Sequence, residues 1–520
     1  MKSTQAKMHN PLSSSAKAAP EALVVDWLAD IARIYPQQAS LIDLVTGRRF
    51  VYHQTFDRVC RLAAVFRSQG CTRGDRVMAL VRNSTDVYEM MFACWRIGAV
   101  FMPVNWRLAP AELAAIHSDG DPALLIVDDE FAANLDSSGK PRLSRSPGSA
   151  TSSYERALAA ALPDRSFAAI DLDAMNMLMY TSGTTGKPKG VIGNWRMTTT
   201  MLLQAATNAR LGPGCVTLTA APLFHTAGLN SFATPTLHVG GAIAVMDNWQ
   251  PGACLAHLRD PDLKITHTLG VPTQFLAMSR HADFSAGGFP FLRVAAVGGA
   301  PPTEELMRTW AEKGHALMPG YGMTEAFGVA NMEPELAMRK PGAVGRAMAM
   351  TRLRIADEQG LELPAGERGE IQLAGPGITP GYWRQPELTQ AAFVDGWFRT
   401  GDIGFMDSDG ICFLVDRKKD MFISGGENVY PAEVENLLAD FPEISQVAVI
   451  GIKDPVWGEV GKAIVVLRPG AAVDAAELLG RCRGRIAAYK IPKAMLILPS
   501  LPLSAQGKVM KNELRKLYGG

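Results

Sequence analysis

The chain has 520 residues, and at roughly 100 to 200 residues per domain this length predicts two to four structural units. Hydrophobic residues make up 47% of the chain and charged residues 20%, while the formal net charge is only +1. This is the composition of a globular protein, and its charge balance excludes binding of nucleic acid through bulk positive charge.

The chain begins with a polar segment, Met1 to Pro20, which is rich in Ser, Ala and Lys. It lacks an apolar stretch of signal-peptide length, so we expect a disordered leader at residues 1–20 and no export. The seven cysteines are widely scattered, with no CxxC pair and no histidine at metal-ligand spacing. These features predict a cytoplasmic protein in a reducing compartment, without structural zinc.

Strand-like and helix-like segments alternate through the first four-fifths of the chain. A strand-like run at 75–81 precedes a helical pattern at 87–97, and a helical pattern at 110–119 precedes a strand-like run at 124–127. The stretch 144–153 has the composition of a surface loop. The alternation predicts α/β layers with a largely parallel sheet.

One apolar segment, residues 211–246, is a candidate membrane span, because it contains no Asp, Glu, Lys or Arg. Pro213, Pro222, Pro235 and several glycines interrupt it, which a membrane-spanning helix would rarely tolerate together. We therefore expect no transmembrane span here, and instead buried strands and turns around a pocket. Weak peripheral contact with a membrane stays open.

A cluster of charged residues at 416–420 marks a change in the character of the chain. We place a domain boundary there, between an N-terminal domain at 21–417 and a small α+β lid domain at 418–520. The lid is predicted to contain helices at 431–440 and 474–488 and strands at 447–452, 463–467 and 495–498. Pro431 suits the first position of a helix, and Asp474 suits an N-cap.

The strongest chemical signal is YTSGTTGKPKG at residues 180–190. Glycines let backbone N–H groups approach a phosphate closely, hydroxyl groups donate to its oxygens, and lysines offset its charge. The pattern differs from the Walker A loop, because only two residues separate Gly183 from Gly186 and Pro188 stands where Ser or Thr is required. The segment therefore predicts a phosphate-binding loop of another kind.

This loop resembles the signature loop of the adenylate-forming superfamily, which includes acyl-CoA synthetases, peptide-synthetase adenylation domains and firefly luciferase. Further segments resemble the family's motifs in the family's order, from about residue 50 to the C-terminus. They are PLFH at 222–225, GGAPP at 298–302, YGMTE at 321–325, WFRTGD at 397–402, DRKKDMFISGGENVYPAEVE at 416–435 and PLSAQGKVMK at 502–511.

The resemblance implies a large α/β N-terminal domain of layered sheets and helices with a small, mobile α+β C-terminal domain. It also implies an AMP-forming acyl-CoA synthetase, with ATP, Mg²⁺ and coenzyme A (CoA) as cofactor or co-substrates. Such an enzyme joins a carboxylic acid to AMP with release of pyrophosphate and then transfers the acyl group to CoA. The barrier in the first step lies in bringing two anions together.

The resemblance also implies which residues bind ATP. Thr324 would contact the α-phosphate, and Glu325 would bind Mg²⁺. Tyr321 would stack on the adenine, and Asp402 would accept hydrogen bonds from the ribose with help from Arg417. Further nucleotide contacts are implied for Thr181, Ser182, Gly183, Thr184, Thr185, Gly186 and Lys187 around the pyrophosphate, for Gly299, Ala300 and Pro301 around the adenine, and for Gly322.

In the C-terminal domain, Lys508 resembles the mobile lysine that bridges the substrate carboxylate and the α-phosphate. Lys419 stands at the family's hinge, about which the domain rotates between the two half-reactions. Gly425 and Gly426 would face the tunnel for the pantetheine arm of CoA. Nearby lysines are expected at the surface or in weak contact with CoA phosphates: Lys490, Lys493 and Lys511.

The sequence leaves the acid substrate open. His225 is a candidate to gate the acyl pocket or the thiol tunnel. The expected pocket segments at 224–234, 269–274 and 326–331 are mostly apolar, which suits a fatty chain or an aryl ring. We favour a medium-chain or long-chain fatty acid, with an aryl or cinnamate-type acid such as benzoate, coumarate or ferulate as the alternative.

Other functions predict other products or partners. An ATP hydrolase or kinase would also need a phosphate loop and Mg²⁺, but it would release ADP instead of AMP. A non-catalytic nucleotide-binding protein would not need both Glu325 and Lys508, and nothing in the sequence distinguishes luciferase-like oxygen chemistry. A homodimer stays open as well.

Overall fold

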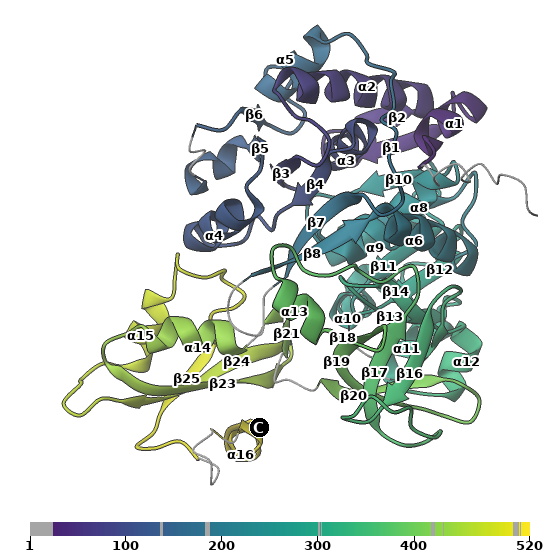
Figure 1. The fold of residues 1–520 in the computed structure, drawn as a ribbon. Helices are drawn as coiled ribbons and strands as arrows, with labels where there is room; N and C mark the ends of the chain where they lie inside the picture. The colour runs from purple at the N-terminus through teal and green to yellow at the C-terminus, as the bar shows by residue number, and fades with distance from the viewer. Residues whose placement is uncertain are drawn as a thin grey trace, which may run out of the picture.

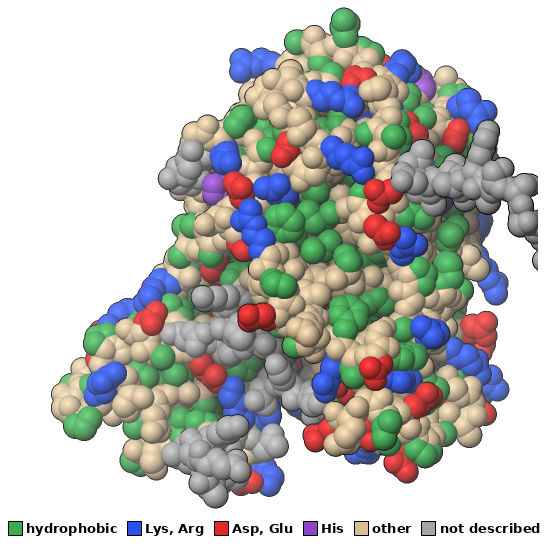
Figure 2. Space-filling model, in the orientation of Figure 1, with side chains coloured by type: hydrophobic (Ala, Val, Ile, Leu, Met, Phe, Trp, Pro, Cys, Tyr) green, Lys and Arg blue, Asp and Glu red, His purple; other side chains and the backbone are tan. Residues whose placement is uncertain are grey.

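The computed structural model describes residues 24–135, 139–181, 188–299, 302, 304–417, 422–429, 431–502, 509 and 511–519. Mixed α/β sheets build a large N-terminal domain and a smaller C-terminal domain (Figure 1). Charged side chains of both signs are interspersed over the face in Figure 2, as the net charge of +1 leads one to expect.

The first sheet has six strands in the order β6-β5-β3-β4-β7-β8. Neighbours are parallel except β7 and β8, which form an antiparallel pair. Helices alternate with the parallel strands, as the sequence predicted. The strands are β3 (Arg76–Leu80), β4 (Val100–Pro103), β5 (Leu124–Asp128), β6 (Arg142–Arg145), β7 (Met175–Thr181) and β8 (Lys189–Asn194).

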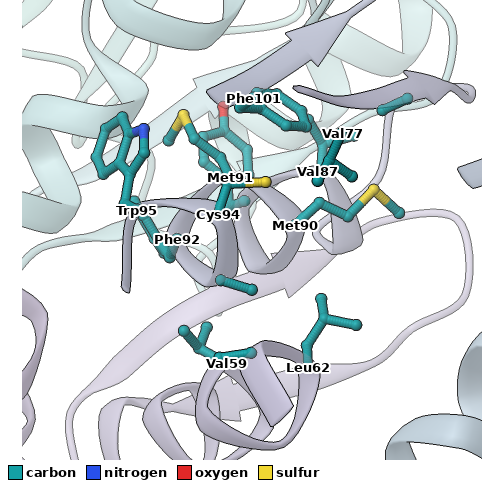
Figure 3. Packing of buried hydrophobic residues seen from close by; sticks show 14 of the residues in the cluster. Val59, Leu62, Val77, Val87, Met90, Met91, Phe92, Cys94, Trp95 and Phe101 are labelled. Carbon is teal, nitrogen blue, oxygen red and sulfur yellow. The ribbon is translucent and has the colours of Figure 1, made fainter. Parts of the chain in front are cut away.

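Helix α3 (Asp86–Ile97) is buried along its whole length, because it packs between this sheet and helix α2 (Tyr52–Ser68). Figure 3 shows side chains of α3, including Met91 and Trp95, between Phe101 of β4 and Val59 of α2. The other helices before β8 are α1 (Trp27–Ile34), α4 (Pro110–Gly120) and α5 (Ser153–Ala160), with a 3₁₀ turn η1 (Asp129–Asn134).

The second sheet has fourteen strands, in the order β16-β17-β19-β20-β15-β14-β13-β12-β11-β9-β10-β1-β2, with β18 paired to β19. Its strands are β1 (Ala39–Asp43), β2 (Arg49–Val51), β9 (Val216–Thr219), β10 (Ala242–Val245), β11 (His267–Gly270), β12 (Val294–Val297), β13 (Leu317–Met323), β14 (Phe327–Asn331), β15 (Ala343–Ala347), β16 (Arg352–Ala356), β17 (Gly369–Ala374), β18 (Phe393–Val394), β19 (Trp397–Met406) and β20 (Cys412–Arg417).

The prediction of a largely parallel sheet holds for the run from β1 to β13 but is wrong for β13 to β20, which are antiparallel. Short turns suffice between antiparallel strands, so this region has few helices. The helices from β8 to β20 are α6 (Trp195–Asn208), α7 (Thr226–Asn230), α8 (Ala233–His238), α9 (Pro251–Arg259), α10 (Pro272–Arg280), α11 (Glu304–Glu312), α12 (Pro334–Arg339) and α13 (Pro386–Ala391), with a 3₁₀ turn η2 (Ala282–Ser285).

The apolar segment 211–246 folds into strands β9 and β10 and the short helices α7 and α8 between them. Among the described residues, no helix is long and apolar enough to cross a membrane. The segment 144–153, predicted as a loop, begins inside β6, where Arg145 forms an ion pair with Asp128 of β5. The first two residues of this segment therefore belong to a strand, although its composition indicated a loop.

The C-terminal domain contains a five-stranded sheet with helices on both faces (Figure 1). Val449 of β23 packs toward α14 and α15, whereas its neighbours Ala448 and Ile450 pack toward α16, as the alternation of a strand requires. The elements are β21 (Phe422–Ser424), β22 (Glu427–Val429), α14 (Pro431–Ala439), β23 (Ile444–Asp454), β24 (Gly458–Leu467), α15 (Ala475–Arg481), β25 (Ala494–Ile497) and α16 (Lys511–Tyr518).

The helix predicted at 474–488 begins as expected, because the Asp474 carboxylate accepts a hydrogen bond from the Glu477 N–H at 2.7 Å. It ends early, at Arg481. Gly484 has a φ of +74°, a left-handed conformation that an α-helix does not continue through. The predicted extension to residue 488 is therefore wrong.

Candidate active site

A cavity of about 1160 Å³ lies at the carboxyl ends of the parallel strands β9 to β13. Ligands of open α/β sheets bind at this edge, since the loops that follow the strands converge there. Helix α6 and strands β14 and β19 close other sides of the cavity, and residues 425–427, 456 and 457 of the C-terminal domain complete it. Both domains thus contribute to one site.

The predicted phosphate loop joins β7 to β8 at the edge of this cavity. Thr181 and Lys189, at the two ends of the loop, both line the cavity. The Thr181 hydroxyl is buried without a hydrogen-bond partner among the described residues, which fits a donor intended for a ligand. The remaining predicted loop residues lie outside the described residues: Ser182, Gly183, Thr184, Thr185, Gly186 and Lys187.

Glu325 is 5% exposed, and it lines the cavity together with its neighbour Thr324. Its Oε1 accepts hydrogen bonds from Lys189 Nζ at 3.0 Å and from the Tyr382 hydroxyl at 2.9 Å. The Lys189 ammonium also lies 4.3 Å from the centre of the Tyr382 ring. One carboxylate is therefore held rigidly beside the phosphate loop by two donors.

The chemistry of this site fits Mg²⁺. No group of three or more metal-ligating side chains occurs among the described residues. Mg²⁺, however, is commonly held by one or two carboxylates and by the phosphates of a bound nucleotide, and it keeps several waters. Glu325 supplies a hard oxygen ligand of this type at the cavity wall.

The predicted nucleoside-binding residues lie on one side of the cavity. Tyr321 on β13 donates a hydrogen bond from its hydroxyl to Asp402 Oδ2 at 2.6 Å, and both side chains are buried. Arg417 is the register partner of Asp402 on the neighbouring strand β20. Gly299 and Gly322 also line the cavity, and a Cβ at Gly322 would lie 2.2 Å from the Phe327 carbonyl oxygen.

Ala300 and Pro301 lie outside the described residues, as do the predicted hinge Lys419 and the predicted catalytic Lys508. Their roles therefore stay predictions.

His225 and the C-terminal domain meet at another part of the cavity wall. The Glu427 carboxylate accepts a hydrogen bond from Arg107 Nη1 at 3.0 Å and pairs with His225 Nε2. Burial tends to raise the pKa of Glu427, but the His225 and Arg107 charges outweigh it and hold that pKa below its usual value. Gly425 and Gly426 precede Glu427 and line the same cavity.

The expectation that Lys490 is a surface charge or a weak phosphate contact is wrong. Lys490 is 3% exposed, and its ammonium is paired with two carboxylates, which offset the cost of burying it. Lys511 pairs with Glu435 at 2.6 Å, and the Lys493 ammonium lies 5.3 Å from the centre of a Trp457 ring.

The predicted pocket segments 224–234, 269–274 and 326–331 each contribute residues to the cavity wall. Helix α6, which the sequence analysis did not single out, contributes a further wall. Apolar side chains dominate in this part of the cavity, and a few polar ones accompany them. The apolar set is Met201, Ala205, Phe232, Met318 and Phe327, and the polar set is Gln204, Asn208 and Ser231.

Sequence reasoning missed several residues of the site. Lys189 and Glu427 each stand inside a motif that had been recognised, so their position beside named residues was an available signal. Arg107 and Tyr382 belong to no such motif, and only the fold brings them to the cavity.

Comparisons with known proteins agree with this geometry. The family model described as AMP-binding enzyme matches residues 28–383, and the model of the C-terminal domain of that family matches residues 433–508. A feruloyl-CoA synthase of Amycolatopsis sp is 39% identical over 494 residues, which are 95% of this chain and 98% of the relative. An indoleacetate–CoA ligase of Aromatoleum aromaticum is 36% identical over 95% of this chain and 97% of the relative.

A long-chain-fatty-acid–CoA ligase of Mycobacterium tuberculosis is 32% identical over 95% of this chain and 98% of the relative. Among solved structures, an o-succinylbenzoate CoA synthetase of Bacillus subtilis, bound with its product analogue, has a TM-score of 0.87 and 28% identity, with 95% and 99% of the two chains covered. ATP-bound MatB of Rhodopseudomonas palustris has a TM-score of 0.70 and 31% identity, with 94% and 98% covered.

The motifs, the shared cavity and these matches over nearly the whole chain converge on one result. The chain belongs to the AMP-binding enzyme family, and it is an AMP-forming acid–thiol ligase.

Proposed function

We propose that this enzyme converts an aromatic acid of the aryl or cinnamate type into its CoA thioester. The main support for this proposal is the sequence identity to the relatives. Two relatives named for aromatic acids are 39% and 36% identical to this chain, whereas a relative named for long-chain fatty acids is 32% identical. This order favours the alternative substrate class over the fatty acid that the sequence analysis preferred.

The wall between α6 and the β13–β14 hairpin supports an aromatic substrate. Phe232, Met318 and Phe327 provide apolar surface that suits a planar ring. Asn208 and Ser231 add polar groups to this wall, which suit hydroxyl or methoxy substituents. Asn208 Nδ2 already donates to the Gln204 carbonyl at 2.8 Å, so its amide oxygen and the Ser231 hydroxyl are the groups that would meet such substituents.

Two bond exchanges make up the proposed reaction. In the first, a carboxylate oxygen of the acid bonds to the α-phosphorus of ATP, and the bond to pyrophosphate breaks. In the second, the sulfur of CoA bonds to the acyl carbon, the bond to the AMP oxygen breaks, and the thiol proton passes to solvent. The acid, ATP and CoA are small molecules, and all three fit the family.

The side chains around the cavity have distinct proposed roles in the first step. Thr181 and Lys189 bind phosphate oxygens, Tyr321 and Asp402 bind the nucleoside, and Lys508 neutralises the two anions as they meet. Glu325 would hold Mg²⁺, which supplies charge neutralisation on the phosphates when bound.

The second step is proposed to use the surface that residues 425–427 present to the cavity. Gly426 has no side chain, and a Cβ there would fill the space up to Val271 Cγ2 at 3.6 Å, so the glycine keeps this part of the cavity wall open on the side where the pantetheine arm is proposed to enter. We place the domain boundary at residue 417 and the hinge at Lys419, so the C-terminal domain at 418–520 rotates as a unit between the two steps.

Release of AMP and pyrophosphate from purified enzyme, Mg·ATP and CoA tests this function across acetate, octanoate, palmitate, benzoate, cinnamate and ferulate. We expect AMP formation that depends on the aromatic acids, with the larger kcat/KM for cinnamate or ferulate. A higher kcat/KM for palmitate would restore the fatty-acid interpretation. ADP as the nucleotide product would overturn the proposed reaction altogether.

A further inference from the structure

A buried ion cluster joins the two domains away from the cavity wall. The Lys490 ammonium donates to Glu112 Oε1 of the N-terminal domain at 2.7 Å and also pairs with Glu433 of the C-terminal domain. The side chains of Glu112, Lys490 and Glu433 are 11%, 4% and 11% exposed. Beside them, Asn105 Nδ2 donates to the Tyr489 hydroxyl at 3.3 Å across the same interface.

Glu112 belongs to an element of the N-terminal domain, whereas Glu433 and Lys490 belong to the C-terminal domain. Glu112 is the third residue of α4, and its Oε2 accepts a hydrogen bond from the Ala109 N–H at 2.8 Å, which caps that helix. Glu433 lies in the first turn of α14, and Lys490 lies in the segment before β25. Rotation of the C-terminal domain would therefore carry Lys490 and Glu433 away together and leave Glu112 behind.

The overall structure in which the cluster exists is similar to that of a synthetase bound with its product analogue. The TM-score is 0.87 with the synthetase bound to its product analogue and 0.70 with the ATP-bound enzyme, although the ATP-bound enzyme is the more similar in sequence. Apo MatB has the same TM-score of 0.70, and at nearly equal coverage the lower value despite higher identity points to a different placement of one domain in MatB, with or without ATP. Residues 425–427 line the cavity in this same arrangement.

We propose that Glu112, Lys490 and Glu433 form a latch that positions the C-terminal domain for the thiol-transfer step and has no part in adenylation. This inference rests on the proposed two-step function. The three residues contact neither substrate nor reacting atoms in the proposal, so they are positioning residues. Their effect is on the population of one domain arrangement.

The physical basis is the number of charged partners of Lys490, which differs between the two domain arrangements. In the latched arrangement the Lys490 ammonium has two carboxylate partners, and after rotation it keeps only Glu433. Rotation opens this interface to water, whereas loss of the Glu112 charge in the latched arrangement leaves the Lys490 ammonium buried with one carboxylate fewer, which is costly. The contact with Glu112 therefore favours the latched arrangement.

Glu112→Gln is the sharpest variant, because glutamine at the third position of a helix still accepts the capping hydrogen bond from Ala109 N–H and only the charge is lost. We expect the single-turnover rate of thiol transfer, from supplied acyl-adenylate and CoA, to fall about tenfold or more. Acid-dependent pyrophosphate exchange without CoA should stay within about twofold of the wild type, because that step uses the other arrangement.

Lys516, whose ammonium pairs with Glu513 of the same helix, provides the matched control. Lys516→Met should leave both half-reactions unchanged, since its partner Glu513 lies on α16 and its side chain is 72% exposed.

Energy transfer between two fluorophores, one on each domain, reports the domain arrangement directly. It therefore tests the latch independently of the proposed function. All seven native cysteines are buried, so fluorophores can be attached at cysteines introduced at the exposed Glu312 and Glu477, one in each domain. We expect Glu112→Gln to shift the energy transfer between them without any substrate.

Unchanged energy transfer and unchanged thiol transfer in Glu112→Gln would overturn the latch, whatever the substrate. An equal loss of both half-reactions would also overturn it, because it would indicate a general structural defect. Absence of acid-dependent AMP formation in the wild type would overturn the proposed function instead, and it would leave the result from energy transfer valid.

Discussion

At the residue scale, the Tyr321–Asp402 hydrogen bond links the proposed base-stacking residue to the proposed ribose-binding carboxylate. Tyr321→Phe keeps the ring but removes the donor that orients Asp402. A hydrogen bond to a charged group contributes about 1.5 to 3 kcal/mol, so we expect KM for ATP to rise roughly tenfold or more. Steady-state kinetics with ATP, acid and CoA varied in turn would detect this, and an equal rise in all three KM values would contradict it.

Lys508 is the second prediction at this scale, and it comes from the motif at 502–511 alone. Lys508→Ala should lower the adenylation rate by a factor that corresponds to about 3 to 4 kcal/mol, the cost of deleting comparable electrostatic stabilisers. Thioester formation from a supplied acyl-adenylate should be largely spared. Rapid-quench measurement of each half-reaction tests this, and equal loss in both would refute the assignment.

At the element scale, a buried ion network joins β5, β6 and α3. Arg145, which is 1% exposed, donates to Asp128 Oδ1 at 2.6 Å and to Asp86 Oδ2 at 3.0 Å. Burial raises the pKa of Asp128 even beside Arg145, which indicates how poorly solvated this carboxyl is. The connection between these elements therefore depends on the arginine.

Arg145→Met should destabilise the N-terminal domain by about 3 to 5 kcal/mol, because Asp128 would stay buried without its arginine and Asp86 would keep only Arg48. Thermal unfolding followed by circular dichroism would measure the loss. Arg196→Met is the matched control: Arg196 and Asp173 are 45% and 70% exposed, and exposed pairs contribute about 0 to 1 kcal/mol. Similar unfolding temperatures for the two variants would show that the network is not stabilising.

At the scale of the whole molecule, the interdomain cluster predicts a pH-dependent domain arrangement. Burial raises the pKa of Glu433 to about 7, with Lys490 opposing the shift and the hydrogen bond with Glu112 adding to it. The latched arrangement therefore favours protonated Glu433. Its stability contribution is present below the ordinary pKa of 4.5 and is lost as the pH rises through about 7.

Glu112 and Lys490 do not titrate between pH 4.5 and 7, because the pKa of Glu112 is lowered below 4.5 and that of Lys490 is raised above 10.5. We expect the latched population to fall by up to about tenfold per pH unit between pH 5 and 7, the limit for one proton. Energy transfer between labelled domains would measure it. Glu433→Gln should remove the dependence, and an unchanged pH profile in that variant would contradict the assignment.

The sequence by itself determined the family, the order of the motifs and most local elements. The phosphate loop, YGMTE and WFRTGD are contiguous, because glycines, hydroxyls and charges must follow one another to surround a nucleotide, so a single chain segment carries the signal. The N-cap at Asp474 and the alternation of strands and helices before residue 300 are likewise local properties. They were predicted correctly for that reason.

Only the tertiary structure decided which residues far apart in the chain lie close together in space. Arg107 and Glu427 are separated by 320 residues, and Lys490 and Glu112 by 378, so no local pattern announces either pair. Lys490 was expected to be a surface charge or a weak contact to CoA phosphates. Lysines are seldom fully buried, and this one is buried because two carboxylates from different domains pair with it. Composition alone also left the substrate class open between a fatty and an aromatic acid, since an apolar wall suits a ring as well as a chain. The shape of a pocket depends on packing between segments that the sequence does not place side by side.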